Sequence, residues 1–235
     1  MIKILILSLF IINAFGSGFP YYYYDINNVK KQKKEFMRIL LPLVNRSNKK
    51  IEKEREFVKN FFKIAEKNDF RGLNVDNLKN LIRLYHKYKI KQLFDKKQYL
   101  KRIDTVPASL ALAQAAIESG WGKSRFVLEA NNIFGHWTYT GKGLVPTNRD
   151  AGKTHMIRIF NSLQSSVNAY TLNLNRNRAY RDFRNRRKKA HDEKKVYNGL
   201  MASKAMINYS ALREKYIKIL NSVIKRNNLL YYDNL

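Results

Sequence analysis

Apolar residues recur at helical spacing through the first third of the chain. Between residues 29 and 68 they fall three or four positions apart, as Phe36 and Leu40 do, and this spacing predicts an amphipathic helix. Pro42 and the polar residues 45–48 predict a kink or break within that helical segment.

The same periodicity predicts two shorter helices further along. One covers about residues 75–88, with Asn74 or Asp76 as its N-cap, and another fills part of residues 91–103. Their outer faces are charged, and no group of residues suited to catalysis occurs among them. We therefore expect residues 17–104 to form a helical scaffold.

A different pattern begins at residue 105, where small and apolar residues fall on every side of the predicted helix. Pro107 suits its first turn, Asp104 or Thr105 can cap it, and Gly120 and Gly122 can end it. A helix that is apolar all round is surrounded by protein. We expect this one at the centre of the fold.

Glu118 is the only ionisable residue between Asp104 and Lys123. Burial and the negative end of the helix dipole should both raise the pKa of its carboxyl group. A carboxylic acid that stays partly protonated near neutral pH can act as a general acid. The alternative is a structural acid paired with Lys123 or Arg125, because structural ion pairs also perturb carboxylates.

Glycine and aromatic residues gather in residues 131–144, which predicts a loop leading into a hairpin. Residues 155–160 are the best candidate for a strand. A helix should follow over about residues 167–175, with Ser162 or Ser165 as its cap.

Two segments complete the chain. The basic run at residues 184–189 is typical of a solvated helix face. A last helix is expected from Ala211 to about Arg226, with Ser210 as its cap.

Composition excludes several kinds of chemistry. The chain has 235 residues, 45% of them apolar and none of them cysteine, so it can form a core but has no thiol nucleophile or thiolate metal site. Its four histidines are scattered, and no glycine-rich phosphate-binding pattern occurs. We therefore expect no metal site and no cofactor.

The N-terminus has the composition of a targeting segment. A basic end precedes a short apolar run over residues 4–12, and Ala14–Gly16 fits a cleavage site. We interpret residues 1–16 as a secretory signal, with an uncleaved anchor or a buried strand as alternatives. No later apolar run is long enough for a membrane span, so we expect a secreted or periplasmic protein of the cell envelope.

The charge of the chain is strongly positive. Its formal net charge is +28, and residues 1–16 carry one lysine and no acid, which leaves +27. Such a surface favours anionic envelope polymers, anionic lipid or nucleic acid. The basic residues are spread over several helices, so we do not expect specific nucleic-acid recognition. A compositional bias of the genome is the alternative explanation.

Two strings of residues carry a family resemblance. Residues 106–126 read VPASLALAQAAIESGWGKSRF, and residues 131–135 follow as NNIFG. Together they closely resemble the glucosaminidase domain of glycoside hydrolase family 73, within its Bax-like subgroup, and weaker likeness extends over about residues 40–230. The resemblance implies a mostly α, lysozyme-like α+β fold. In such a fold a helical core and a small β-hairpin lobe flank a substrate cleft, and residues 105–235 would form the catalytic domain.

The resemblance also implies an endo-β-N-acetylglucosaminidase that cleaves the β-1,4 bond after N-acetylglucosamine in peptidoglycan. Glu118 would protonate the leaving glycosidic oxygen, and Gln114, one turn earlier, could hydrogen-bond substrate. The other substrate-binding candidates lie in the following turn and loop: Trp121, Asn132, Phe134, Trp137 and Tyr139. Core packing is the alternative for Trp121 and Phe134, and Asn132 can also shape the loop by local hydrogen bonds.

One position departs from the family pattern. Relatives commonly carry an acid where Met156 stands, so hydrolysis by two carboxylates lacks its expected second member. Tyr209 matches the family's tyrosine near the last helix and could steady the transition state. Asp150 could act as a base, or could simply form a turn. Rival interpretations are a muramidase or lytic transglycosylase on the same fold, and a non-catalytic cell-wall-binding protein.

Overall fold

The computed structural model describes residues 18–141, 143–146, 149 and 152–233. These form ten α-helices, two short 3-10 helices and a three-stranded antiparallel sheet. The mostly helical, lysozyme-like fold expected from the sequence is therefore confirmed. The predicted signal at residues 1–16 lies outside the described residues.

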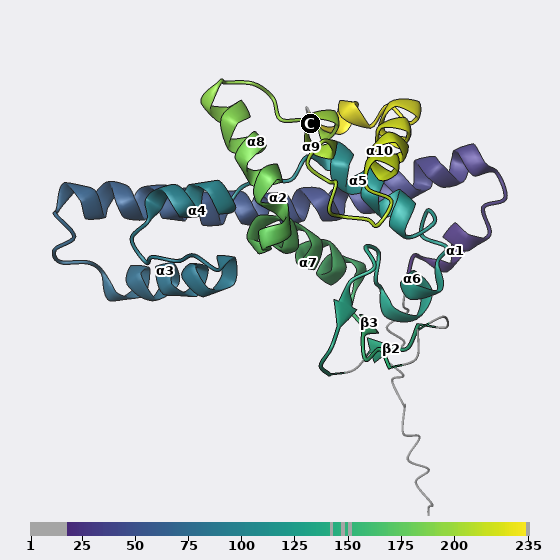
Figure 1. Cartoon of the computed structure of the whole chain (residues 1–235), viewed down its shortest axis with the longest axis horizontal. Helices are drawn as coiled ribbons and strands as arrows, with labels where there is room; N and C mark the ends of the chain where they lie inside the picture. The colour runs from purple at the N-terminus through teal and green to yellow at the C-terminus, as the bar shows by residue number, and fades with distance from the viewer. Residues whose placement is uncertain (1–17, 142, 147–148, 150–151, 234–235) are drawn as a thin grey trace, which may run out of the picture.

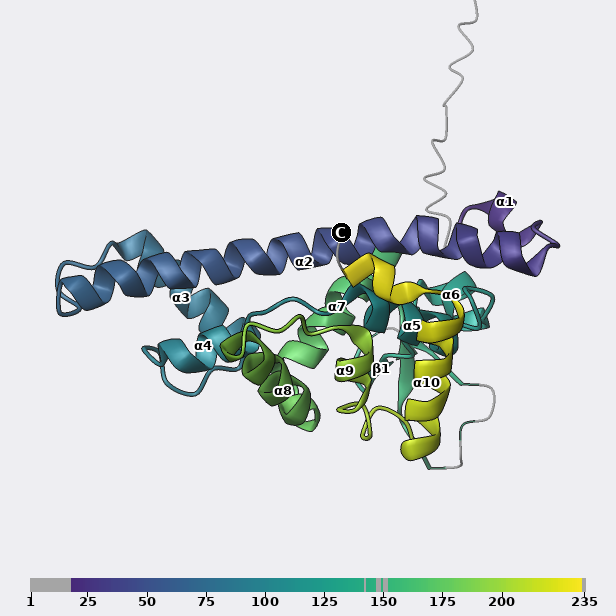
Figure 2. The same ribbon diagram turned by 90° about the horizontal axis from the view of Figure 1, so that it is seen from above.

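A single helix, α2 (Val29–Lys67), runs along the length of the molecule in Figures 1 and 2. It is continuous through Pro42, so the predicted break is wrong. Pro42 removes one hydrogen bond from the helix, but Leu40 and Val44 are buried on either side of it and Ile51 is buried further on. Packing of this face against the rest of the protein outweighs the loss of one hydrogen bond.

Two helices lie against the distal half of α2 and share one hydrophobic core with it. These are α3 (Val75–Tyr88) and α4 (Lys96–Arg102). Asn74 caps α3 by accepting a hydrogen bond from the backbone N–H of Asn77, and Asp95 caps α4. Both helices predicted in this region are confirmed.

A second hydrophobic core surrounds α5 (Ala108–Glu118), in which nine of eleven residues are buried. The elements packed around it are α2, α9 (Gly199–Ser203), α10 (Glu214–Arg226) and the 3-10 helix η2 (Leu229–Asp233). Alanine is the commonest residue of α5, and its small side chain allows these neighbours to approach closely. The central position expected for this helix is confirmed.

The start of α5 differs from the prediction. Neither Asp104 nor Thr105 caps it, because Pro107 occupies the N-cap position. The carboxylate of Asp233, from η2, instead accepts hydrogen bonds from the backbone N–H of Ser109 at 2.8 Å and from its hydroxyl group. A partner 124 residues away therefore satisfies groups for which the sequence offers local candidates.

The small sheet consists of β1 (Trp137–Thr138), β2 (Gly143–Leu144) and β3 (Met156–Arg158). The strand predicted within residues 155–160 is confirmed. The predicted loop at residues 131–144 leads into a sheet of order β1-β3-β2, in which the consecutive strands β2 and β3 are antiparallel neighbours and β1 pairs with the other edge of β3. A Cβ atom at Gly143 would lie 2.6 Å from that of Met156, so glycine permits the close approach of β2 to β3.

The remaining elements connect the sheet to the helical core. They are α1 (Tyr21–Tyr24), α6 (Arg125–Ala130), α7 (Leu163–Arg176), the 3-10 helix η1 (Arg178–Tyr180) and α8 (Arg181–Asp192). The side chain of Ser162 caps α7, as predicted. In contrast, α10 begins at Glu214 rather than Ala211, with Arg213 instead of Ser210 at the N-cap position.

The basic run on α8 is not a wholly solvated face, and that prediction is wrong. The side chains of Arg184 and Arg187 lie in the interior, where each residue is almost fully buried. The Nη1 atom of Arg184 donates hydrogen bonds to the carbonyl oxygens of Leu174 at 2.7 Å and Asn177 at 2.8 Å. Leu174 lies in the last turn of α7, where carbonyl groups lack the usual helical partner, and the carbonyl oxygen of Asn177 also accepts a hydrogen bond from the backbone N–H of Tyr180 at 3.2 Å.

None of the helices in the described part of the chain has both the length and the apolar character that crossing a membrane would require. The two cores meet along α2, whose first half packs around α5 and whose second half packs against α3 and α4. The division of the chain at residue 104 stays a prediction.

Candidate active site

Glu118 is the last residue of α5, at the end opposite to Pro107. Its burial raises the pKa of the carboxyl group, and a hydrogen bond from Tyr216 lowers it by less. Within the described residues no ion pair includes Glu118, while Arg125 pairs with Glu129 at 3.0 Å. The carboxyl group therefore has the raised pKa expected of a general acid. It does not form the ion pair with Arg125 that the alternative interpretation expected.

A chain of hydrogen bonds holds this carboxyl group in place. Tyr170 donates its hydroxyl proton to Oε1 of Gln114 at 2.7 Å, and Nε2 of Gln114 donates to the hydroxyl oxygen of Tyr216 at 3.1 Å. Tyr216 in turn donates to Oε1 of Glu118 at 2.8 Å. These directions follow from the orientation of the Gln114 amide, which accepts at Oε1 and donates at Nε2.

Gln114 is thus a buried link in this chain, with no exposed surface. Both ends of its amide contact neighbouring tyrosines. Its role as a substrate-binding residue stays a prediction, and its observed contacts are those of a residue that positions Tyr216.

Tyrosine rings surround the carboxyl group of Glu118. The ring of Tyr209 stacks on that of Tyr216 with centroids 5.6 Å apart and an interplanar angle of 10°, and Tyr180 lies 6.0 Å from Tyr209. Burial and the charge of Glu118 raise the pKa of Tyr180 to about 12 and raise the pKa of Tyr209 well above its usual range. These phenols remain protonated, so the wall around Glu118 is neutral and partly apolar.

The aromatic candidates fall into two groups. The edge-on contact of Trp121 with Phe36, at 5.3 Å, and the stacking of Phe134 on Tyr170, at 3.9 Å, join both side chains to the core. Core packing, the alternative expected for these two, accounts for their positions.

Trp137 and Tyr139 lie on the surface instead, with 57% and 66% of their area exposed. The ring of Trp137 stacks on that of His155 at 4.3 Å. An exposed, flat ring suits stacking on a sugar, so these two remain available for that role.

Asn132 shapes the loop before β1. Its Nδ2 atom donates hydrogen bonds to the carbonyl oxygens of His136 at 2.9 Å and Arg158 at 2.8 Å, and its Oδ1 atom accepts one from the backbone N–H of His136 at 2.9 Å. Only 1% of the residue is exposed. These contacts fix the loop onto β3. They are the loop-shaping hydrogen bonds that the sequence analysis expected of Asn132 as an alternative to substrate binding.

Comparison with known proteins assigns the family. A family model named Glucosaminidase, described as mannosyl-glycoprotein endo-β-N-acetylglucosaminidase, matches residues 93–229, more than half of the chain. The chain belongs to the glucosaminidase family. The matched range contains Glu118, Tyr170, Tyr209 and Tyr216.

Similarity to an individual protein supports the same family. The chain is 30% identical over 161 residues to "Protein bax" of Escherichia coli (strain K12), an alignment that covers 66% of this chain and 55% of that protein. The chain therefore spans about half the length of this curated relative. No solved structure matches the chain.

Two positions bear on the second catalytic group of a glucosaminidase. Met156 is half-buried in β3, opposite Thr138, where it can neither accept nor donate a proton. Asp150 lies outside the described residues, so its role as a base stays a prediction.

Tyr216 is the residue that the sequence analysis missed. Tyr209 is the tyrosine suggested by the family resemblance, yet it is Tyr216 that donates a hydrogen bond to Glu118. The signal lay in the helical pattern, because Tyr216, Leu220 and Ile224 form the buried face of α10. A polar hydroxyl group on such a face usually has a specific partner.

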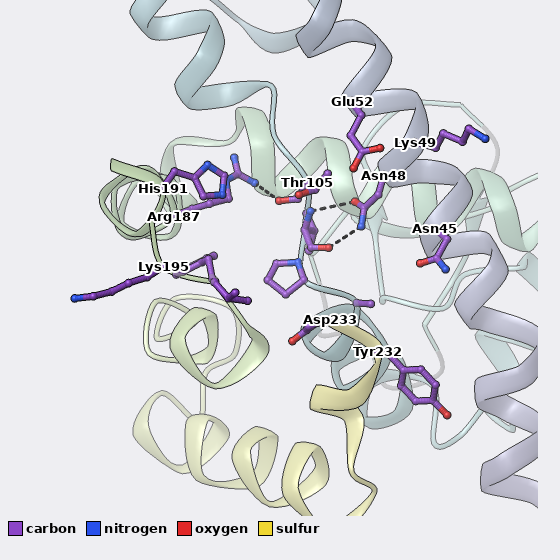
Figure 3. Close-up of a pocket in the computed structure, with 15 residues that line it drawn as sticks. Asn45, Asn48, Lys49, Glu52, Thr105, Arg187, His191, Lys195, Tyr232 and Asp233 are labelled. Atoms are coloured by element: carbon purple, nitrogen blue, oxygen red, sulfur yellow. Dashed lines mark hydrogen bonds between the residues drawn. The ribbon is translucent and has the colours of Figure 1, made fainter. Parts of the chain in front are cut away.

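The predicted cleft around Glu118 stays a prediction. The cavity in Figure 3, of about 430 Å³, lies instead at the opposite end of α5. There Asn48 exchanges two hydrogen bonds with the backbone of Val106, and Arg187 donates one to the carbonyl oxygen of Thr105 at 2.7 Å. These contacts join α2 and α8 to the segment before α5.

Proposed function

We propose that this chain is an endo-β-N-acetylglucosaminidase that hydrolyses the β-1,4 bond after N-acetylglucosamine in peptidoglycan, in the periplasm or outside the cell. Family membership supports the substrate class. The observation that carries the proposal is the carboxyl group of Glu118, whose pKa is raised by burial and which no described cation neutralises. A glycosidase needs such a group to protonate the leaving oxygen.

The hydrogen bond from Tyr216 supports a definite role for each carboxyl oxygen. Tyr216 occupies Oε1 of Glu118, which leaves Oε2 to carry the acidic proton. That proton passes to the glycosidic oxygen as the bond between this oxygen and the anomeric carbon breaks. The sugar ring then develops positive charge, which the neighbouring neutral phenols of Tyr209 and Tyr216 do not oppose.

For the second step we favour assistance by the substrate. Met156 cannot serve as a base, whereas the 2-acetamido group of N-acetylglucosamine can attack the anomeric carbon, as in other substrate-assisted glycosidases. Water then opens the resulting ring, with Tyr209 supporting the transition state. The alternative is an inverting reaction in which Asp150 activates a water molecule.

Digestion of purified peptidoglycan tests the function directly. Mass spectrometry of the products should find new reducing ends at N-acetylglucosamine. Reducing muramic acid or anhydromuramic acid ends would identify a muramidase or a lytic transglycosylase instead. Binding without any cleavage would identify a non-catalytic wall-binding protein, the candidate that Met156 favours.

Replacement of Tyr216 by phenylalanine should move the alkaline limb of the pH–activity profile to higher pH. The hydrogen bond from Tyr216 lowers the pKa of Glu118, so its removal should raise that pKa and keep the acid protonated to higher pH. The measurement is kcat/KM against pH. Tyr209→Phe is the comparison: it should lower the rate and leave this limb in place, and an unmoved limb in Tyr216→Phe would contradict the assignment.

The anomeric product separates the two routes for the second step. Substrate assistance predicts retention of the β-anomer in the first product, observed by NMR, and predicts that Asp150→Asn keeps much of the activity. An α-anomer together with an inactive Asp150→Asn variant would establish Asp150 as the base of an inverting enzyme.

A further inference from the structure

A second cavity with an unusual lining lies where α4, α7 and α8 meet. It has a volume of about 830 Å³, and eight of its eleven lining residues are Lys or Arg, while none is Asp or Glu. The whole chain contains 46 such basic residues among 235, so they are concentrated here. The other three lining residues are Gln98, Asn173 and Asn177, so every lining side chain carries an N–H donor.

The cations of this cavity have no acidic partner among the described residues. Within the described part of the chain, none of its eight Lys and Arg residues takes part in an ion pair. Cations nearby do have one, since Arg83 and Lys87 both contact Glu54. In the described part of the chain, carboxylates therefore lie beside other basic residues but not beside this group.

Arg184 is the deepest of these cations, with 2% of its surface exposed. Burial and the like charges of Arg102, Arg187 and Arg181 lower its pKa to about 10. A buried guanidinium surrounded by other cations is unfavourable unless a counter-charge is present. An anion in the cavity would supply that charge.

Capping of α7 accounts for only part of the arrangement. Arg102 donates to the carbonyl oxygen of Tyr88, at the end of α3, at 2.8 Å and to that of Arg176, at the end of α7, at 3.0 Å. Arg184 binds two further carbonyl groups near the end of α7. A helix C-terminus offers roughly half a negative charge, against eight positive charges here. Arg178 and Arg181 line the cavity from exposed positions and have no capping role.

We propose that this basic cavity, between α4, α7 and α8, binds a polymer of repeated phosphate groups. The planar donor forks of its five arginines match phosphate oxygens. No aromatic residue lines the cavity, whereas proteins that hold single-stranded nucleic acid stack its bases on aromatic rings. In this cavity a phosphate chain without bases therefore fits better than a nucleic acid, whose bases could stack only in the neighbouring cavity lined by Tyr88 and Trp137. The proposal does not depend on the glycosidase reaction.

The shape of the site fits a chain better than a single ion. Asn173 and Arg176 also line a neighbouring cavity of about 600 Å³, which reaches Trp137 and Arg158. The positive surface thus continues along α7 toward the sheet. Linear inorganic polyphosphate and a poly(glycerol phosphate) share the required chemistry and represent a free and an envelope-borne source.

The test is a binding titration of the full chain with each of these two polymers at physiological ionic strength. Arg178→Glu combined with Arg181→Glu changes two exposed residues and should preserve the fold. We expect this double variant to raise the dissociation constant about tenfold or more, because hydrogen bonds between charged groups contribute more to binding than neutral ones do. Lys30→Glu combined with Lys34→Glu, at exposed positions near the start of α2, changes the net charge equally and should alter binding less than about twofold.

Arg184→Lys provides a second variant, which retains the charge and removes the planar fork, and it should also weaken binding. Tight binding of either polymer supports the site and identifies its source. Failure of both polymers to bind, equal weakening in the Lys30 and Lys34 control, or equally tight binding of oligothymidylate of the same charge would overturn the proposal. Peptidoglycan cleavage should be unchanged in the Arg178 and Arg181 variant, so the two proposals fail separately.

Discussion

Glu118→Gln should lower the rate of peptidoglycan hydrolysis by roughly 10²–10⁴-fold, the usual contribution of general acid catalysis. Glutamine keeps the shape of the side chain and an oxygen that accepts the hydrogen bond from Tyr216, but it has no proton to give to the leaving oxygen. Binding to peptidoglycan should persist. The measurement is the initial rate of reducing-end release at the optimal pH, with the pelleted fraction as the measure of binding.

The matched control is Glu129→Gln, an acid on the surface of α6 that pairs with Arg125 and should leave the rate unchanged. The Glu118→Gln variant should also be at least as stable as the parent at neutral pH. The pKa of Glu118 is raised in the folded protein. Its favourable contribution to the free energy of unfolding is therefore complete below the pKa that Glu118 has in the unfolded chain, and it is lost as the pH rises through the pKa that Glu118 has in the folded protein. Undiminished hydrolysis by a correctly folded variant would remove Glu118 from the mechanism.

Asp104→Asn should lower the free energy of unfolding by about 3–5 kcal/mol, the cost typical of leaving a buried charge without its partner. Three basic side chains surround this buried carboxylate: Oδ2 lies 3.2 Å from Nδ1 of His191, 3.5 Å from Nε of Arg187 and 3.6 Å from Nη1 of Arg55. An asparagine would leave Arg187 in the interior without counter-charge. Urea denaturation at neutral pH measures the change.

Asp182→Asn is the control for that measurement, because Asp182 pairs with Arg186 on the exposed surface of α8 and such pairs contribute at most about 1 kcal/mol. Burial would raise the pKa of Asp104, but the hydrogen bond from His191 and the charges of Arg187 and Arg55 outweigh it and lower the pKa. The contribution of Asp104 to the free energy of unfolding is therefore complete above about pH 3.9, the ordinary pKa of an aspartate. It is lost as the pH falls through the pKa that Asp104 has in the folded protein. Equal destabilisation by both variants would refute this account.

The sequence predicted the elements whose signals are local. Helix α3 has its cap at Asn74 and a clear apolar face, and α5 is apolar on every side, so both could be located, as could the raised pKa of Glu118. The predictions were wrong where contacts with residues distant in the sequence determine the local structure. Pro42 is tolerated because packing on α2 outweighs it, and α5 is capped by Asp233 from the other end of the chain.

In the candidate site, too, some residues could be predicted from local sequence and others could not. Glu118 follows from its isolation in an apolar segment. Its hydroxyl partner does not, because Tyr209 lies just before the predicted last helix and Tyr216 lies within it, so the sequence offers two candidates. Only the packing of α10 against α5 decides which hydroxyl group reaches the carboxylate. Likewise, the buried guanidinium of Arg184 is satisfied by the carbonyl oxygens of Leu174 and Asn177, and a run of basic residues does not reveal such partners.

The continuity of α2 restricts how the length of this chain can change in evolution. Val44 packs in the core around α5, and Ile51 packs in the core with α3 and α4. One residue inserted between them would turn the distal half of the helix by about 100° and point its apolar side chains away from α3 and α4. Insertions in the largely exposed connection at residues 68–74 would disturb neither core, so homologues should vary in length there and keep the spacing from Val44 to Ile51.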